Sequence, residues 1–212
     1  MPLRLFVLGA TGHIGAHTLE LALARGHRVT AFVRSPHKVT RNDPKLTVIQ
    51  GDPLASEPLA RALAGHDAVL SSLGPSPREA LRPSTLMAEF AASTVAAMKT
   101  AKVKRLGVVS AAVLFPDPRL RFRLIQWVLR HHARDLTAME AVVQATDLDW
   151  TIARPPRLVT GPGESYRVEP FALPAKAWSM SFRAVAKFLL EAVDQGAHVR
   201  EVVGLGSGSE GR

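Results

Sequence analysis

The 212-residue chain contains no cysteine. This absence excludes disulfide bonds, thiolate nucleophiles and cysteine-ligated metal sites, and we expect no metal site and a cytoplasmic location. No apolar run reaches about eighteen residues, so we expect no membrane-spanning helix. The first residues lead straight into a glycine-rich turn, so we expect no signal peptide. Acidic residues are too few to balance the basic ones, and the net charge of +9 suits anionic ligands. Because that charge comes without an aromatic stacking platform or a groove-reading motif, we expect no nucleic-acid partner.

What the chain does have is the glycine-rich turn GATGHIG at residues 9–15, directly after the apolar run 3–8. A helix pattern, a break and a second apolar run follow, which is the strand–turn–helix–strand unit of a dinucleotide site. In such a turn Gly9 allows a sharp change of direction, Gly12 lets the backbone approach a pyrophosphate, and Gly15 lets the helix pack close to the strand. The helix N-terminus offers free N–H groups and a positive dipole end to phosphates. The alternative is a surface turn that happens to be rich in glycine.

Strand and helix patterns alternate along the rest of the chain. Repeated βα units with apolar strands predict an α/β protein: a Rossmann-type doubly wound parallel sheet in three αβα layers, forming one domain over residues 1–204, with a flexible tail at 205–212. We predict strands at 3–8, 28–33, 46–50, 67–72, 104–109, 149–153 and 198–203, and helices reaching to about 25 and covering 55–64, 84–101, 119–146 and 182–194.

The end of the second strand selects the cofactor, because a carboxylate there binds a free ribose 2′-hydroxyl whereas an Arg accommodates a 2′-phosphate. Here the strand ends in Arg34, Lys38 follows, and no carboxylate comes before Asp43. The planar fork of an Arg and the point charge of a Lys both bind phosphate, so we predict NADP(H) as the cofactor. The alternative is that both residues are ordinary solvated charges.

Two further turns follow strands of the predicted sheet. Asp52 and Pro53 come after the third strand, where Asp52 would face the adenine amino group, cap the next helix, or do both. Leu73 and Gly74 come after the fourth strand, in a turn that would run beside the nicotinamide ribose; the alternative is a plain loop. We include all four residues in the predicted cofactor site.

Together these residues resemble the atypical short-chain dehydrogenase/reductases, in particular the NAD(P)H-binding, NmrA-like group that includes biliverdin reductase B and bacterial NADH–flavin reductases. The resemblance implies that Thr11, Gly12, His13 and Ile14 hold the pyrophosphate and Arg34 the 2′-phosphate. It also implies that Ser110 and Pro155 border the nicotinamide. The motifs that carry the resemblance are GATGHIG at 9–15, VRSP at 33–36, GD at 51–52, AV at 68–69 through LG at 73–74, VSA at 109–111 and LDWTIARPP at 148–156.

The acid–base pair of the larger family, a Tyr with a Lys four residues later, has no match here. The single tyrosine, Tyr166, lies beyond the sixth strand, and Pro170 stands four residues after it. In the family's extended members a Glu follows the Lys by four residues; if Glu140 is that Glu, Leu136 stands at the Lys position and His132 at the Tyr position. A histidine there could donate a proton near neutral pH. The alternative is that His132 is a surface residue of a basic helix.

This pattern favours one class of reaction. Reduction of a carbonyl develops an alkoxide and needs a positioned acid, whereas a flavin or quinone spreads the incoming charge over its rings, so that stacking and exclusion of water suffice. We therefore predict an NADP(H)-dependent reductase, monomeric or homodimeric, with a flavin or quinone-like acceptor. Ser110 would orient the nicotinamide or the acceptor, or merely bond a loop. Two alternatives stay open: a non-catalytic NADP(H)-binding redox sensor, and a carbonyl reductase or epimerase that relies on His132.

Basic residues also crowd one predicted helix. Such a stretch forms a solvent face, a wall that attracts anionic substrates, or a surface for a partner or an acidic membrane. The loop at 116–118 before it is a candidate lid. The residues are Arg119, Arg121, Arg123, Arg130, His131, His132 and Arg134.

Overall fold

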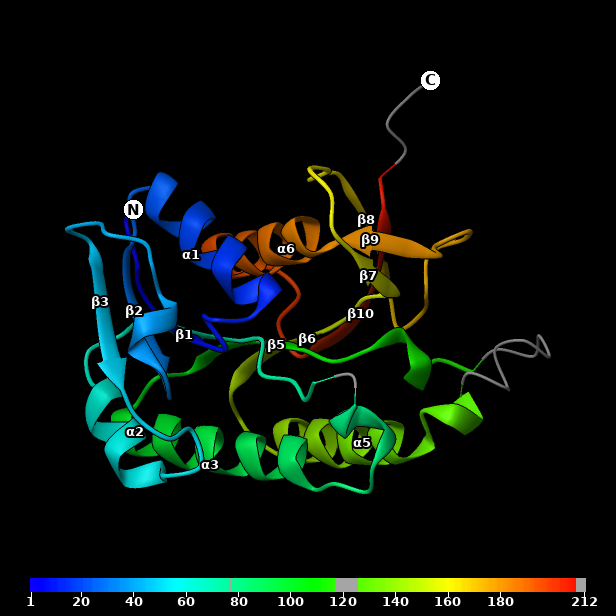
Figure 1. Ribbon diagram of the computed structural model, residues 1–212, viewed down its shortest axis with the longest axis horizontal. Helices are drawn as coiled ribbons and strands as arrows, with labels where there is room; N and C mark the ends of the chain where they lie inside the picture. Colours follow the sequence, from blue (N-terminus) through cyan, green and yellow to red (C-terminus); the bar gives the residue numbers. More distant parts are fainter. Residues whose placement is uncertain (77, 117–125, 209–212) are drawn as a thin grey trace.

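The computed structural model describes residues 1–76, 78–116 and 126–208. It forms three layers, with helices on both faces of one central sheet (Figure 1). The helices α1 (His13–Ala24) and α6 (Phe182–Asp194) cover one face, and α2 (Ser56–Leu63), α3 (Leu86–Ala101) and α5 (Arg130–Gln144) cover the other. The predicted fold class, an αβα Rossmann-type domain, is thereby confirmed.

The central sheet has eight strands in the order β3-β2-β1-β4-β5-β6-β10-β8. All neighbouring pairs are parallel except β10 with β8, which is antiparallel. Because the order reverses beside β1, the carboxyl ends of β1 and β4 form the crevice where such sheets bind ligands. The strands are β1 Arg4–Leu8, β2 Arg28–Val33, β3 Leu46–Gln50, β4 Ala68–Ser71, β5 Arg105–Val109, β6 Asp149–Arg154, β8 Tyr166–Pro170 and β10 Glu201–Ser207.

The apolar strands explain the two cores. Residues 5–8, 29–33 and 68–71 are buried without interruption, as expected for parallel strands covered on both faces. Alternate side chains of each strand enter opposite cores, so that Leu5 and Val7 pack under α1 and α6 while Phe6 and Leu8 pack over α2 and α3. This double burial holds the carboxyl ends of the strands in fixed positions.

A contact between helices fixes the position of α5. Asp135 of α5 is buried, and its two carboxylate oxygens accept hydrogen bonds from the backbone N–H groups of Met87 and Ala88, both at 3.1 Å. These N–H groups lie in the first turn of α3, where no intrahelical carbonyl is available. A carboxylate at the positive end of the α3 dipole therefore joins the two helices.

Several boundaries differ from the sequence predictions. Helix α5 begins at Arg130, so it covers only the later part of the predicted helical region 119–146; residues 117–125 lie outside the described residues, with three of the basic residues and most of the candidate lid. The last strand occupies 201–207 and not 198–203, because residues 198–200 form a turn. Residues 205–207 therefore belong to β10 and not to a flexible tail, and Leu205 is fully buried; residues 209–212 lie outside the described part.

Three short strands were not predicted. Besides β8, a separate parallel pair joins β7 (Arg157–Val159) to β9 (Ser179–Ser181). Their sequences alternate weakly and contain charges and proline, so the hydrophobic period does not reveal them. They matter because the segment between β8 and β9 borders a cavity at the edge of the sheet.

Candidate functional site

The glycine-rich turn is as crowded as its sequence predicts. Gly9 has φ +80°, and a Cβ on it would lie 2.7 Å from the carbonyl carbon of Ser72. A Cβ on Gly15 would lie 2.1 Å from the carbonyl oxygen of Gly9, so α1 starts against the turn itself. The N–H of Gly12 donates to that same oxygen at 2.9 Å. Both Gly9 and Gly15 are thus required by close backbone approach.

The N-terminus of α1 is left open toward a ligand. Its N-cap residue, Gly12, offers no side-chain cap, and the first turn contains no acidic residue. The free N–H groups and the positive dipole end therefore suit a pyrophosphate. His13 is exposed and stacks on the ring of Phe182, with centroids 4.6 Å apart, which joins the start of α1 to the start of α6, whereas Ile14 is buried in the core.

A cavity of about 270 Å³ adjoins the turn. It brings together six of the residues that we predicted for the cofactor from four separate parts of the sequence. Arg34 and Lys38 are exposed at this cavity, where their charges are available to a phosphate, while Pro53 is buried. The lining residues are Gly9, Thr11, Phe32, Val33, Arg34, Ser35, Lys38, Pro53 and Leu73.

Asp52 and Gly74 lie beside this cavity's lining segments without belonging to them. Asp52 is exposed, and its Oδ1 accepts a hydrogen bond from the N–H of Leu54 at 3.0 Å. It does not cap the following helix, because the N-cap of α2 is Ala55, without a side-chain hydrogen bond. The capping alternative is therefore wrong, and the bond that the Asp52 carboxylate makes in this turn uses its Oδ1 atom. Gly74 is exposed with nothing within 4 Å of a Cβ.

A buried polar network stands at the carboxyl ends of β5 and β6. The hydroxyl of Ser110 donates to Oε1 of Glu140 at 2.6 Å. The guanidinium of Arg154 binds both oxygens of the same carboxylate, with Nε 2.9 Å from Oε1 and Nη2 2.6 Å from Oε2. The Glu140 side chain is only 4% exposed and that of Arg154 16%. Sequence reasoning used Glu140 only to align the helix and missed its central role, since nothing in its spacing connects it to Arg154.

Backbone contacts hold this network in place. The N–H of Ser110 donates to the carbonyl of Ala153 at 2.7 Å, and the N–H of Ala112 donates to the carbonyl of Pro155 at 2.9 Å. The guanidinium of Arg154 also lies over the ring of Phe115, 4.7 Å from its centroid. Ser110 and Pro155, which the family resemblance assigns to the nicotinamide, therefore lie on adjoining segments.

The α5 positions that would hold the family's acid–base pair are also defined. His132, Leu136 and Glu140 are four residues apart and lie along one helix face. Leu136 is buried in the core and carries no charge. His132 lies about 12 Å along the helix axis from Glu140, at 1.5 Å per residue, and is not part of the Ser110 network. Burial lowers the pKa of His132 below its ordinary value, with Asp135 opposing the shift.

The single tyrosine is engaged elsewhere. Tyr166 lies on β8, and its hydroxyl donates to Glu191 of α6, on the face of the sheet opposite α5. Burial, with the hydrogen bond to Glu191, raises the pKa of Tyr166 well above its ordinary value. Tyr166 is therefore not placed to act as a proton donor at the end of β5.

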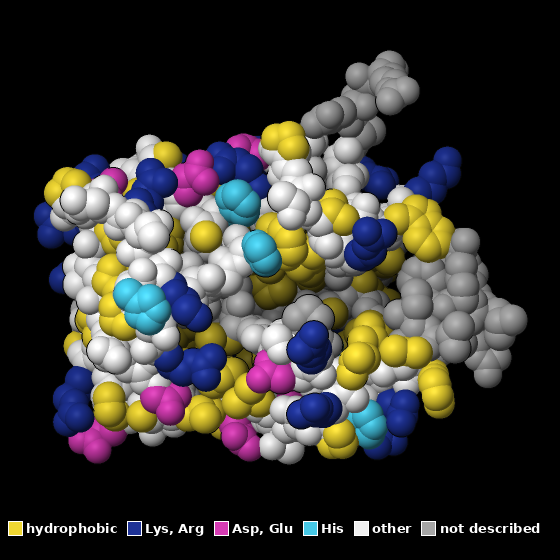
Figure 2. Space-filling model, in the orientation of Figure 1, with side chains coloured by type: hydrophobic (Ala, Val, Ile, Leu, Met, Phe, Trp, Pro, Cys, Tyr) yellow, Lys and Arg dark blue, Asp and Glu magenta, His cyan; other side chains and the backbone are white. Residues whose placement is uncertain are grey.

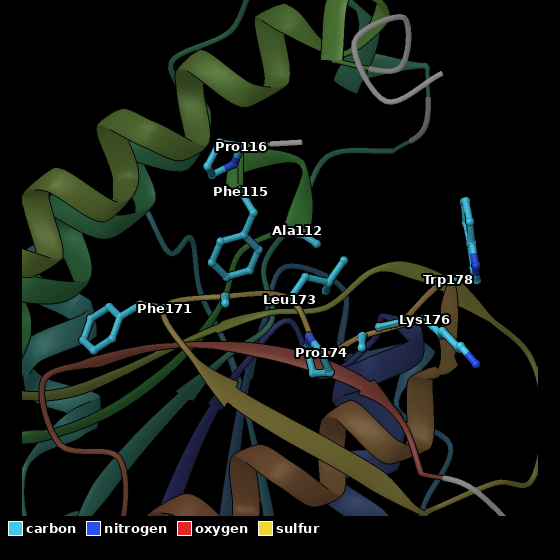
Figure 3. Close-up of a pocket in the computed structure, with 11 residues that line it drawn as sticks. Ala112, Phe115, Pro116, Phe171, Leu173, Pro174, Lys176 and Trp178 are labelled. Atoms are coloured by element: carbon cyan, nitrogen blue, oxygen red, sulfur yellow. The ribbon is translucent and has the colours of Figure 1, made fainter. Parts of the chain in front are cut away.

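A second cavity of about 350 Å³, lined by both polar and apolar atoms, lies beside the Ser110 network, which Phe115 joins to it (Figure 3). Phe115 faces Leu173 and Pro174 across it. Phe171 and Lys176 both have left-handed backbones, with φ +58° and +59°, a conformation that costs a non-glycine residue energy and is common at binding sites. Among the residues that the structure describes, no acidic side chain lines the cavity, which is formed by Ala112, Phe115, Pro116, Phe171, Ala172, Leu173, Pro174, Ala175, Lys176, Ala177 and Trp178.

The surface agrees with an anionic ligand. Figure 2 shows the molecule hollowed along its middle, between the two helical layers, with Lys, Arg and His side chains and fewer Asp or Glu side chains beside the hollow. In the basic stretch, Arg130 and Arg134 are exposed, and Arg130 lies over the ring of Trp127 at 4.9 Å. The described part of that stretch thus forms a solvent face. Within the described residues no three His, Asp or Glu side chains gather as metal ligands, and none of the helices could span a membrane.

Comparison with known proteins defines the class. A family model described as NAD(P)H-binding matches residues 9–196, so the chain belongs to this family of NAD(P)H-binding proteins. The resemblance to the atypical short-chain dehydrogenase/reductases is confirmed at this level, and the NmrA-like group fits it.

Two related proteins match this chain over only part of its length. A stretch of 66 residues is 39% identical to a 3-beta-hydroxysteroid dehydrogenase of Mycolicibacterium neoaurum, covering 31% of this chain and 18% of that protein. A stretch of 124 residues is 32% identical to the uncharacterized protein YwnB of Bacillus subtilis, covering 58% and 54%. The chain therefore spans about half or less of the length of these two relatives.

Solved structures match over nearly the whole chain. A Rossmann-fold NAD(P)-binding family protein from Shigella flexneri is 27% identical with a TM-score of 0.74, covering 99% of this chain and 95% of that one. A short-chain dehydrogenase/reductase from Veillonella parvula, solved in complex with NADP, has a TM-score of 0.78 at 21% identity, covering 99% and 96%. The second likeness is one of fold alone.

Proposed function

We propose that the protein is an NADP(H)-dependent oxidoreductase that passes hydride to a flavin, a quinone or a similar conjugated acceptor. One observation carries the proposal: a cavity lined by Phe115, which packs against Arg154 of the Ser110 network, lies at this end of the sheet, while the α5 positions that would supply a proton donor and its lysine hold a histidine and a leucine. Such a site can stack a flat acceptor and exclude water, but it has little means of protonating an alkoxide.

Two features support NADP(H) over NAD(H). Arg34 and Lys38 line the cavity beside the glycine turn, and both are exposed to it. The described residues that line this cavity include two positive charges and no carboxylate, which favours a 2′-phosphate. Residues 11–14 with the open end of α1 would hold the pyrophosphate, and Asp52 the adenine amino group.

The residues of this chain then have distinct parts in the reaction. The bound nicotinamide supplies the hydride. Phe115 and the segment 171–178 enclose the acceptor and exclude water, and Lys176 offers a positive charge at the cavity rim. Ser110 orients the ligand at the end of β5, and Pro155 borders it. His132 is assigned no proton transfer in this reaction, because it lies about 12 Å along the axis of α5 from Glu140, outside the Ser110 network.

The direct test is consumption of NADPH with riboflavin, FMN and a simple quinone, measured beside the dissociation constants of NADPH and NADH. Turnover well above the uncatalysed rate on a conjugated acceptor supports the proposal. Tight NADPH binding without turnover on any of these acceptors contradicts it.

That second outcome would favour a redox sensor, which binds NADP(H) and signals to a partner. Trp127 is 63% exposed and Val128 42%, beside the cation of Arg130, which is the composition of a protein-binding surface. A carbonyl reductase or epimerase is disfavoured because the candidate acid that α5 offers it, His132, lies outside the Ser110 network and has a lowered pKa. We further propose a cytoplasmic location and a monomeric or homodimeric state.

A further inference from the structure

The hydrogen bond between Ser110 and Glu140 has a defined direction. A serine hydroxyl carries one proton and two lone pairs, whereas an ionised carboxylate only accepts. The oxygens are 2.6 Å apart, Ser110 is 7% exposed and Glu140 3%, so water does not compete for this bond. The single proton of Ser110 is therefore committed to Glu140, and only the lone pairs of its oxygen remain free.

Arg154 faces the Glu140 carboxylate with two donors. An arginine in a protein is always charged, and here it binds both carboxylate oxygens, at 2.9 and 2.6 Å. The guanidinium itself is held over the ring of Phe115. The N–H of Ser110 donates to the carbonyl of Ala153, which fixes the backbone from which the hydroxyl reaches the carboxylate.

We propose that Glu140 is a positioning residue that makes the Ser110 hydroxyl a hydrogen-bond acceptor toward the bound ligand. The ligand must then present an N–H or O–H group at the carboxyl end of β5, and a bare carbonyl oxygen or oxyanion finds no donor in Ser110. This inference rests on the proposed function, in which two sources offer such a group: the carboxamide NH₂ of the nicotinamide and a ring N–H of a flavin acceptor.

The first arm of the test concerns the cofactor. NADP⁺ and its 3-acetylpyridine analogue differ only in that a methyl group replaces the carboxamide NH₂, while the carbonyl is kept. Calorimetric dissociation constants of the two oxidised forms give a discrimination ratio that needs no turnover. One hydrogen bond to Ser110 predicts a preference of about three- to tenfold for NADP⁺. Failure of the reductase activity would leave this measurement unaffected.

The second arm concerns the acceptor. Lumiflavin and N3-methyl lumiflavin differ in the ring N–H, and their binding to the NADP⁺-saturated protein is followed by flavin fluorescence. If the N–H group that binds Ser110 belongs to the acceptor, lumiflavin binds about three- to tenfold more tightly than N3-methyl lumiflavin, and the two cofactors bind equally well. The two arms therefore assign the donor.

Ser110→Ala removes the acceptor oxygen and leaves the Glu140–Arg154 pair intact. We expect the discriminating ratio to fall to about one, because the donor-bearing ligand binds more weakly while its methyl counterpart is unchanged. Relief of a steric clash would instead tighten binding of the methyl ligand. Ser110→Thr keeps the hydroxyl and should keep the ratio, and Thr137→Ala removes an exposed hydroxyl of α5 that bonds only its own helix, so it should change nothing.

The role of Glu140 needs a variant that folds. The double variant Glu140→Met with Arg154→Met removes the ion pair as a unit and leaves Ser110 in place with its proton released. If Glu140 acts through Ser110, the ratio falls toward that of Ser110→Ala while the protein still unfolds cooperatively. The proposal is overturned if Ser110→Ala leaves both ratios unchanged, or if it weakens carbonyl-only and N–H-bearing ligands equally. It is also overturned if the folded double variant keeps the wild-type ratio.

Discussion

The carbonyl oxygen of Gly9 lies only 2.1 Å from the place where a Cβ on Gly15 would stand. The turn and the first helix therefore touch through backbone alone, and this contact sets the open N-terminus of α1 beside the cavity that contains Arg34. Gly15→Ala should destabilise the protein by about 1–3 kcal/mol through overpacking and weaken NADPH binding with it. Urea unfolding and calorimetry check both. Gly161→Ala is the control, since nothing lies within 4 Å of its Cβ; equal effects at the two positions would contradict the account.

The cofactor preference depends on Arg34. Removing a charge-assisted hydrogen bond of about 1.5–3 kcal/mol predicts that Arg34→Ala reduces the ratio of NADPH to NADH affinity by about tenfold or more. Lys38→Ala should have a smaller effect, because a lysine acts as a point charge. Arg41→Ala, a nearby exposed arginine outside the cavity lining, should leave the ratio unchanged. An unchanged ratio in Arg34→Ala would show that the assignment to NADP(H) is wrong.

The buried Glu140–Arg154 pair predicts an asymmetry in stability. Glu140→Ala leaves a guanidinium with only 16% of its side chain exposed and no counterion, which should cost about 3–5 kcal/mol. The double methionine variant removes both charges and should be close to wild type in stability. Chemical denaturation of the three proteins measures the difference. A double variant as unstable as Glu140→Ala would contradict this.

His132 separates the proposed reaction from carbonyl chemistry. His132→Phe removes the only candidate acid of α5 and should leave hydride transfer to riboflavin or a quinone within about twofold of wild type. If instead the protein reduces a carbonyl with His132 as acid, the same variant should lose about 10²–10⁴-fold in rate. Steady-state kinetics on both acceptor types distinguish the cases.

Histidine burial also predicts how stability depends on pH. Burial lowers the pKa of His66, whose Nε2 lies 2.8 Å from the hydroxyl of Thr30, below the ordinary value of 6.5. The folded protein then binds fewer protons than the unfolded chain, so stability is fully present above about pH 6.5 and is lost as pH falls through the lowered pKa. His66→Gln should flatten this decline, and exposed His37→Gln should not. Urea unfolding midpoints measured above and below about pH 6.5 test this prediction. It is contradicted if the midpoint of His66→Gln depends on pH in the same way as that of the wild type.

The sequence predicted the fold correctly and named six residues that line one cavity, because both depend on local patterns; that these residues bind the cofactor stays a prediction. The glycine spacing, the apolar strands and the position of Arg34 at a strand end are each visible within a few residues. The Ser110–Glu140–Arg154 network was not predictable, since its members are separated along the chain and come together only when α5 packs on β6. The strands β7, β8 and β9 were missed for a related reason: they are short and partly polar, and their pairing is decided by tertiary contacts.

The most direct test of the central claim is the rate of NADPH oxidation with excess riboflavin, compared with the same mixture without protein and with Gly15→Ala in place of wild type. The account predicts turnover well above background that falls in the variant in parallel with its loss of NADPH affinity. Tight NADPH binding with a rate equal to background on riboflavin, FMN and a quinone would contradict it and identify a protein that binds the cofactor without passing on its hydride.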